Sequence, residues 1–120
     1  MKDEEMRQPL RGRTKLFALR IIRMYTQLPK KTEVQVMGKQ VLRSGTSVGA
    51  NYREAYRARS DAEFVAKMGD SLRELDETAY WLELLVESNN VPSNKMADLL
   101  DETNQLIAIF TTIIKNKKGK

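Results

Sequence analysis

The chain contains no cysteine and no histidine. Without cysteine it can form no disulfide, no thiolate nucleophile and no cysteine-ligated zinc or iron–sulfur site. Without histidine it lacks the commonest general base and the commonest transition-metal ligand. Three prolines and six glycines in 120 residues are also too few for a turn-rich β fold. These absences favour a helical protein that is not an enzyme, and we expect no cofactor and no metal.

Long hydrophobic runs are absent as well, since no segment approaches the roughly 18 apolar residues that a membrane-spanning helix needs. The opening segment, MKDEEMRQPLRGR, has no apolar core of the kind found in signal peptides. We therefore expect a cytoplasmic protein with no membrane partner. With 41% hydrophobic and 31% charged residues in 120, the composition is that of one folded domain.

Charge is unevenly distributed along the chain. Through residue 59 there are 14 Lys and Arg against five Asp and Glu, whereas the remainder has seven against eleven. The basic half could pair with the acidic half or bind a polyanion.

Apolar residues recur at helical spacing in four stretches, which predict helices over residues 14–28, 32–56, 61–88 and 92–116. Short connections between amphipathic helices predict an all-α, antiparallel up-and-down four-helix bundle. The bundle is expected over residues 13–116. Residues 1–12, with Pro9 and Gly12, are expected to form a flexible N-terminal arm, and residues 117–120 a frayed basic tail.

Two helix starts carry the sequence pattern of a capping box, Thr32 to Gln35 and Ser60 to Glu63. Within the second helix, three glycines each cost about 1 kcal/mol of helix propensity relative to alanine. They predict the close approach of a neighbour, and the alternative is a helix broken near Ser44. The three are Gly38, Gly45 and Gly49.

The third helix has a regular heptad seam. Its members are Val65, Met68, Leu72, Leu75, Ala79, Leu82 and Val86. Four further apolar residues, Tyr80, Trp81, Leu84 and Leu85, lie off this seam. Together with the glycine-lined flank of the second helix, this surplus predicts contacts between copies of the chain.

Basic residues form two ridges. The ridge on the second helix comprises Lys39, Arg43, Arg53 and Arg57, and that on the first comprises Arg13, Arg20 and Arg23. Cations at one-turn spacing can follow a phosphate backbone, with salt-dependent affinity. The ridges lack the interleaved aromatics that stack single-stranded bases. A solvated face, or ion pairs with the acidic third helix, is the alternative.

Other polar groups are expected to have structural roles. Ser47, Asn51 and Glu54 lie on one flank of the second helix and are predicted to fix the register between neighbours. Carboxylates on the third helix, such as Glu74, are expected to be solvated. No phosphate-binding or dinucleotide glycine motif occurs. An unrecognised hydrolase would need activity that depends on Glu54 or Glu74.

At these residues the chain resembles a family of small bacterial bundle proteins, the 23S rRNA-intervening-sequence proteins. The resemblance rests on Leu42-Arg43, Ser47-x-x-x-Asn51-x-x-Glu54-Ala55, Arg59-Ser60, Glu63-Phe64 and Ser71-Leu72-x-Glu74-Leu75. It covers nearly the whole chain. Ala55 stands where the family often has glycine, and Asp76 where glutamate is commoner.

The resemblance implies an up-and-down bundle that forms a ring-like homopentamer, with no enzymatic activity. It also relates the chain to accessory proteins of diversity-generating retroelements, which are thought to bind nucleic acid and a reverse transcriptase. We therefore expect an oligomeric protein that binds nucleic acid, RNA more than DNA. The alternative is a scaffold for protein partners with no direct nucleic-acid contact.

Overall fold

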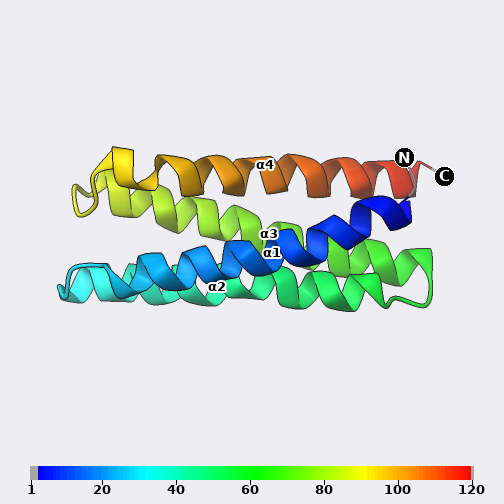
Figure 1. Cartoon of the computed structure of the whole chain (residues 1–120), viewed down its shortest axis with the longest axis horizontal. Coiled ribbons are helices and arrows are strands. Elements are labelled where there is room, and N and C mark those ends of the chain that lie inside the picture. Colours follow the sequence, from blue (N-terminus) through cyan, green and yellow to red (C-terminus); the bar gives the residue numbers. More distant parts are fainter. Residues whose placement is uncertain (1–2, 120) are drawn as a thin grey trace.

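The computed structural model describes residues 3–119, and the side chains from residue 9 onward. These residues form four helices, α1 (Asp3–Thr26), α2 (Thr32–Tyr56), α3 (Asp61–Glu87) and α4 (Ser93–Lys118). Each helix runs antiparallel to the one before it. The start of α1 and the end of α4 therefore lie at the same end of the bundle (Figure 1). The predicted all-α four-helix bundle is confirmed.

The helices pack in chain order, α1 on α2, α2 on α3 and α3 on α4, in a bundle of 47 × 21 × 20 Å. By contrast, α1 and α4 touch over a short region only. They approach each other at the end that holds the termini and diverge toward the opposite end (Figure 1). In the part of the chain that the structure covers, no helix is long and apolar enough to cross a membrane.

The first helix begins earlier than the sequence predicts. Residues 3–12, expected to belong to an arm, are helical, and Pro9 lies inside α1. Proline fixes φ near the helical value but removes one backbone hydrogen bond of the helix, so packing must stabilise this turn. Leu10 is buried, and the Thr14 hydroxyl donates to the Leu10 carbonyl at 2.7 Å, so this segment packs on the core. Residues 1 and 2 lie outside the described residues.

The end of the chain also differs from the expected tail, because Lys117 and Lys118 belong to α4. The Lys117 ammonium lies 3.8 Å from the Asp61 carboxylate and 5.5 Å from the centre of the Phe64 ring. These contacts hold the last turn of α4 against the start of α3. Residue 120 lies outside the described residues.

Only one of the two predicted capping boxes supplies its helix with a side-chain cap. Ser60 caps α3, and its hydroxyl oxygen accepts a hydrogen bond from the Glu63 amide at 3.0 Å. Thr32 is not a cap, because Lys31 holds the extended cap conformation and α2 has no side-chain cap. The Gln35 side chain instead donates to the Pro29 carbonyl at 2.8 Å, bonding the connection rather than the helix start.

The three glycines of α2 face α1, which confirms the predicted close approach. A β-carbon at Gly38 would lie 2.6 Å from Leu28, and one at Gly45 would lie 2.7 Å from Ile21. A β-carbon at Gly49 would lie 3.1 Å from the Thr14 hydroxyl. The helix is continuous through all three positions. Because α1 of the same chain fills the glycine-lined flank, that flank gives no support to contacts between copies.

The buried stripe of α3 is rotated from the predicted seam. Met68, Leu75 and Leu82 are buried as expected, but Val65, Leu72 and Val86 are only half-buried. The positions beside them, namely Phe64, Ser71, Thr78 and Leu85, take their place in the core. The cause is close packing of α2 on α3, which small hydroxyl side chains permit.

Hydrogen bonds satisfy the hydroxyls in this α2–α3 interface. Ser44 and Thr78 bond each other at 2.8 Å between their oxygen atoms, and Ser71 donates to the Val48 carbonyl at 2.8 Å. All three side chains are fully buried. The register between the two helices is therefore fixed by polar contacts as well as by apolar packing.

Candidate nucleic-acid interface

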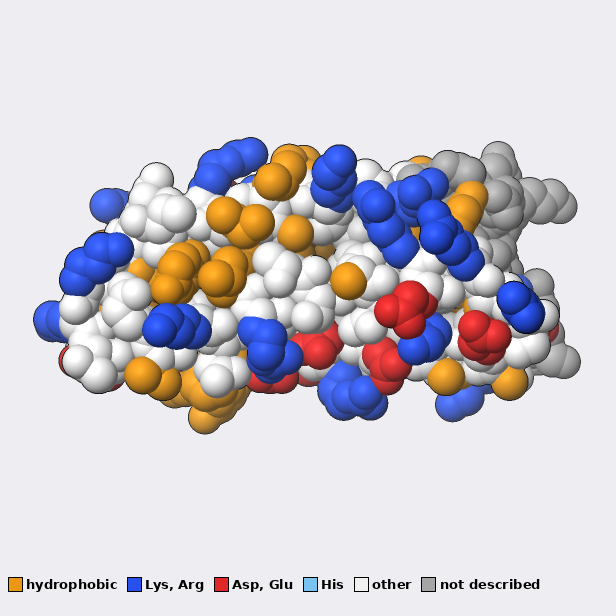
Figure 2. All heavy atoms as spheres, turned by 90° about the horizontal axis from the view of Figure 1, so that it is seen from below, with side chains coloured by type: hydrophobic (Ala, Val, Ile, Leu, Met, Phe, Trp, Pro, Cys, Tyr) orange, Lys and Arg blue, Asp and Glu red, His pale blue; other side chains and the backbone are white. Residues whose placement is uncertain are grey.

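Basic side chains gather on α1 and α2 because these helices carry few acids. Beyond Glu5, α1 has none, and α2 has only Glu33 and Glu54. Figure 2 views the molecule from the α2 side, with Lys and Arg spread along the face and most of the acids in its middle and right. The charge asymmetry of the sequence thus becomes an asymmetry between faces.

One predicted phosphate contact, Arg13, is neutralised within the chain. Its guanidinium donates two hydrogen bonds of 2.8 Å to the Glu102 carboxylate on α4 and one of 2.9 Å to the Gln105 side chain. The hydrogen bond to Glu102 is the largest cause of the raised pKa of Arg13. The ion pair ties α1 to α4 where the two helices meet.

Arg43, in the middle of the α2 ridge, is also paired. Its guanidinium contacts Glu77 and, at 3.3 Å, Glu74 on α3. Glu77 in addition accepts a hydrogen bond from the Trp81 indole at 3.1 Å. The bonds from Arg43 and then Trp81 lower the pKa of the Glu77 carboxyl. Acids of α3 therefore interrupt the predicted ridge at its centre.

The other predicted phosphate contacts have no ion pair with any acid that the structure describes. These are Arg20, Arg23, Lys39, Arg53 and Arg57. All but the half-buried Arg20 are exposed. Arg53 lines a hollow between α1 and α2, and Arg57 follows it by four residues as the C-cap of α2, so both remain available to an anion.

Sequence reasoning missed two cations, Arg11 and Lys15, which lie one turn apart on α1. Lys15 lines a hollow between α1 and α2 that also includes Arg53. The Arg11 guanidinium lies 5.4 Å from the centre of the Tyr56 ring on α2. The spacing of residues 11 and 15 was a usable signal, but only the antiparallel packing of α1 on α2 brings them beside the α2 arginines.

The hollow has a volume of about 320 Å³ and a floor of small side chains. Its floor and walls are formed by Thr14, Ala18, Thr46, Gly49 and Ala50, with Lys15 and Arg53 completing the lining. No acid is among these residues.

The polar flank of α2 makes contacts within the chain. Ser47 donates to the Arg43 carbonyl of its own helix at 2.7 Å. Glu54 pairs with Lys67 of α3 at 2.7 Å. Asn51 is half-buried on the same flank. The Glu54–Lys67 pair joins two helices of one chain, and a role for this flank between copies stays a prediction.

The apolar surplus on α3 is smaller than predicted. Leu85 is fully buried in the core, so its place among the expected surface contacts is wrong. Tyr80 is 53% exposed and packs edge-on against Trp81, with ring centres 5.1 Å apart. Trp81 and Leu84 are half-buried. An aromatic patch of Tyr80, Trp81 and Leu84 therefore remains at the surface.

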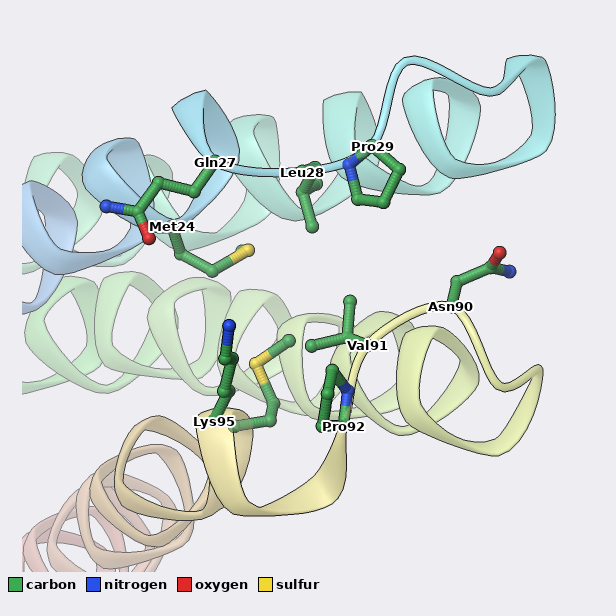
Figure 3. A pocket seen from close by; sticks show the side chains of 9 residues that line it. Met24, Gln27, Leu28, Pro29, Asn90, Val91, Pro92 and Lys95 are labelled. Carbon is green, nitrogen blue, oxygen red and sulfur yellow. The ribbon is translucent and has the colours of Figure 1, made fainter.

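A second hollow, of about 260 Å³, lies where α1 ends and α4 begins (Figure 3). Met24, Leu28 and Pro29 face Val91 and Met96 across it. Lys95 and Gln27 supply polar groups at its rim. The hollow exists because α1 and α4 diverge toward this end (Figure 1). Its mainly apolar lining offers no pair of catalytic groups.

Carboxylates do not gather into a cation site among residues 9–119, whose side chains the structure describes, since no group of three or more Asp and Glu there could hold a metal ion. Asp70 pairs with Arg73 on α3 at 2.6 Å, and Glu54 with Lys67. The carboxylates that the sequence considers for chemistry thus mostly bond cations.

Comparisons with known proteins agree with this architecture. A family model described as 23S rRNA-intervening sequence protein matches residues 11–112. A crystal structure of a protein with unknown function, from the S23 ribosomal protein family of Bacteroides thetaiotaomicron VPI-5482, is 37% identical. The match covers 91% of this chain and 97% of that one, with a TM-score of 0.84. A comparison with curated proteins finds no match.

Proposed function

Since the chain belongs to the family of 23S rRNA-intervening sequence proteins, we propose that it is a non-enzymatic bundle protein that binds nucleic acid through α1 and α2. The supporting observation is the set of exposed cations on these helices that have no ion pair with any described acid. Arg23, Lys39, Arg53 and Arg57 belong to this set, together with Lys15.

An electrostatic argument favours a polyanion over solvent as the partner of this surface. Each phosphate neutralised by Lys or Arg releases counterions, which gives affinity without sequence recognition. Acids of α3 and α4 pair with Arg43 and Arg13, so the chain has acids able to quench cations. They leave the cations near the α1–α2 boundary unpaired, as a phosphate-binding surface requires.

RNA is the more favoured nucleic acid. The matching family takes its name from 23S rRNA, and the similar crystal structure belongs to a family named after a ribosomal protein. Both names concern those proteins, and for this chain they support RNA over DNA as the first ligand to test. A reverse transcriptase or another protein could join such a complex.

The test is a measurement of binding to a structured RNA over a series of salt concentrations. We expect Kd to rise steeply with salt for the wild-type chain. Reversing three unpaired charges, in R23E/R53E/R57E, should weaken binding at least tenfold and flatten the salt dependence. The matched control reverses three exposed lysines of α4, K95E/K115E/K118E, and should retain most of the affinity. Equal affinity of the wild-type chain and R23E/R53E/R57E would refute the proposal.

A second candidate, a scaffold for protein partners, is favoured by the aromatic patch on α3. Exposed aromatic side chains are enriched at protein interfaces, and Tyr80 is more than half exposed. The two candidates share self-assembly, for which a homopentamer is our expectation, and they differ in the role of the cations. The absence of RNA binding by the wild-type chain, even at low salt, would favour the scaffold.

A further inference from the structure

We propose that the hollow between α1 and α2 is a seat for one backbone phosphate of a bound nucleic acid, held between Lys15 and Arg53. The inference rests on the proposed function and adds the position and chemistry of its central contact. Both cations line the hollow, one from each helix, and no acid lines it.

The hollow is open because its floor carries almost no side-chain volume. Gly49 leaves α1 close to α2, since a β-carbon there would lie 3.1 Å from the Thr14 hydroxyl. Ala18 and Ala50 also line the hollow, and each contributes a side chain of only one methyl group. The long side chains of Lys15 and Arg53 can therefore reach over the floor from opposite sides.

The donors of this site are the two cations themselves. The hydroxyls of Thr14 and Thr46 already donate to the Leu10 and Leu42 carbonyls, each at 2.7 Å. A phosphate only accepts hydrogen bonds, so it would be bound by the ammonium of Lys15 and the guanidinium of Arg53. Two like charges on facing helices with no acid between them repel each other, and an anion between them removes that repulsion.

Further cations lie next to the proposed phosphate site along α1 and at the end of α2. Arg11 lies one turn before Lys15 on α1, and Arg57, the C-cap of α2, comes four residues after Arg53. Because the helices are antiparallel, both neighbours lie toward the same end of the bundle, about 6 Å from the seat. A phosphate strand entering at the seat would meet the next cations in that direction.

The decisive variant fills the hollow without changing any charge. In Ala50→Phe the ring occupies the floor, and we expect about tenfold weaker binding of a fluorescently labelled oligouridine, the loss of one charge-assisted contact. The slope of log K against log salt should fall by about 0.7, the share of one phosphate of a single strand. Ala108→Phe, at an exposed alanine on α4, is the matched control and should bind as the wild-type chain does.

Combining variants tests whether both cations hold the same phosphate. K15Q/R53Q should weaken binding about as much as Ala50→Phe, and adding Ala50→Phe to it should have no further effect. Circular dichroism and thermal unfolding establish that each variant is folded. Wild-type affinity in Ala50→Phe, with weakened binding in R23E/R53E/R57E, would overturn the seat and leave the proposed function standing. Binding by the wild-type chain that does not depend on salt would overturn both.

Discussion

At the scale of single residues, the interface between α1 and α2 depends on the absence of side chains at particular positions. Gly45 lies against Ile21, which is fully buried and branched at its β-carbon. A methyl group at Gly45 would meet Ile21 at 2.7 Å, closer than two carbon atoms can approach. One of the two helices would have to move.

Gly45→Ala should therefore destabilise the protein although alanine is the better helix former. Overpacking of a core costs about 1–3 kcal/mol, and the gain in helix propensity is at most about 1 kcal/mol. We expect a net loss in the free energy of unfolding, measured by urea denaturation. Gly69→Ala is the matched control, since a β-carbon there meets nothing within 4 Å, and it should be neutral or stabilising. A stabilised Gly45→Ala would contradict the packing described here.

The Arg43–Glu77 pair gives a pH dependence that can be isolated by Glu77→Gln. Because the pKa of Glu77 is lowered in the folded state, its stabilisation is present above the unfolded pKa of about 4.3. It is lost as pH falls through the lower, folded-state pKa. The two side chains are 49% and 37% exposed, and solvent screening limits the effect to below about 1 kcal/mol.

Urea denaturation at neutral and at acidic pH measures this effect. The wild-type chain should be the more stable at neutral pH, and the difference from Glu77→Gln should disappear in acid. Glu83→Gln, at an exposed position of the same helix, provides the comparison. A difference that grows on acidification would contradict the assignment. The single tryptophan, Trp81, bonds Glu77 and offers a fluorescence signal for the same titration.

At the scale of helices, the beginnings of α2 and α3 look alike in sequence but are built differently. Each has a hydroxyl residue followed three positions later by Gln or Glu, yet only Ser60 bonds the amide of its helix. Pro29 and the extended Lys31 place α2 one residue earlier, so that Thr32 is inside the helix. Local sequence could not decide this, because the path of the connection depends on how α1 ends.

Ser60→Ala should accordingly cost about 1 kcal/mol, the usual value of an N-cap. Thr32→Ala should cost nothing and could gain a few tenths of a kcal/mol, because alanine is the better helix former. Thermal unfolding of both variants under identical conditions measures the contrast. Equal losses in the two variants would mean that Thr32 also caps its helix in solution.

At the scale of the whole molecule, apolar surface remains after the four helices have packed. The aromatic patch lies on α3, and α1 exposes Leu16, Leu19 and Ile22 by 53%, 42% and 41%. Orange side chains gather in the left half of Figure 2. Contiguous exposed apolar patches often mark sites of interaction with another protein.

We expect the protein to self-assemble through the aromatic patch. Replacing two of its residues, in Y80S/L84S, should reduce the molar mass measured by light scattering, while the helical content stays unchanged because both side chains lie outside the core. The comparison variant, L19S/I22S, removes exposed apolar side chains from α1, and an unchanged molar mass in it would assign the contact to α3. A wild-type chain that is monomeric at micromolar concentration would contradict the expectation.

The sequence by itself determined the number of helices, the extent of α2 and α3, the need for a close neighbour at the glycines of α2 and the asymmetry of charge. These follow from periodicity and composition, which are local properties of the chain. The sequence did not predict burial at positions where it depends on the packing of two helices. Ser71 and Thr78 are polar and so look exposed, yet a facing helix supplies their hydrogen-bond partners and buries them.

The tertiary structure alone decided which cations are available. Arg13 and Arg43 look like their neighbours in sequence, but acids 89 and 34 residues away neutralise them. Lys15 and Arg53 line the same hollow only because α1 runs antiparallel to α2 at the close distance that Gly49 permits. Coulomb interactions depend on distance in space, so a charge pattern read along the chain establishes the sign of a surface but not the place where an anion can bind.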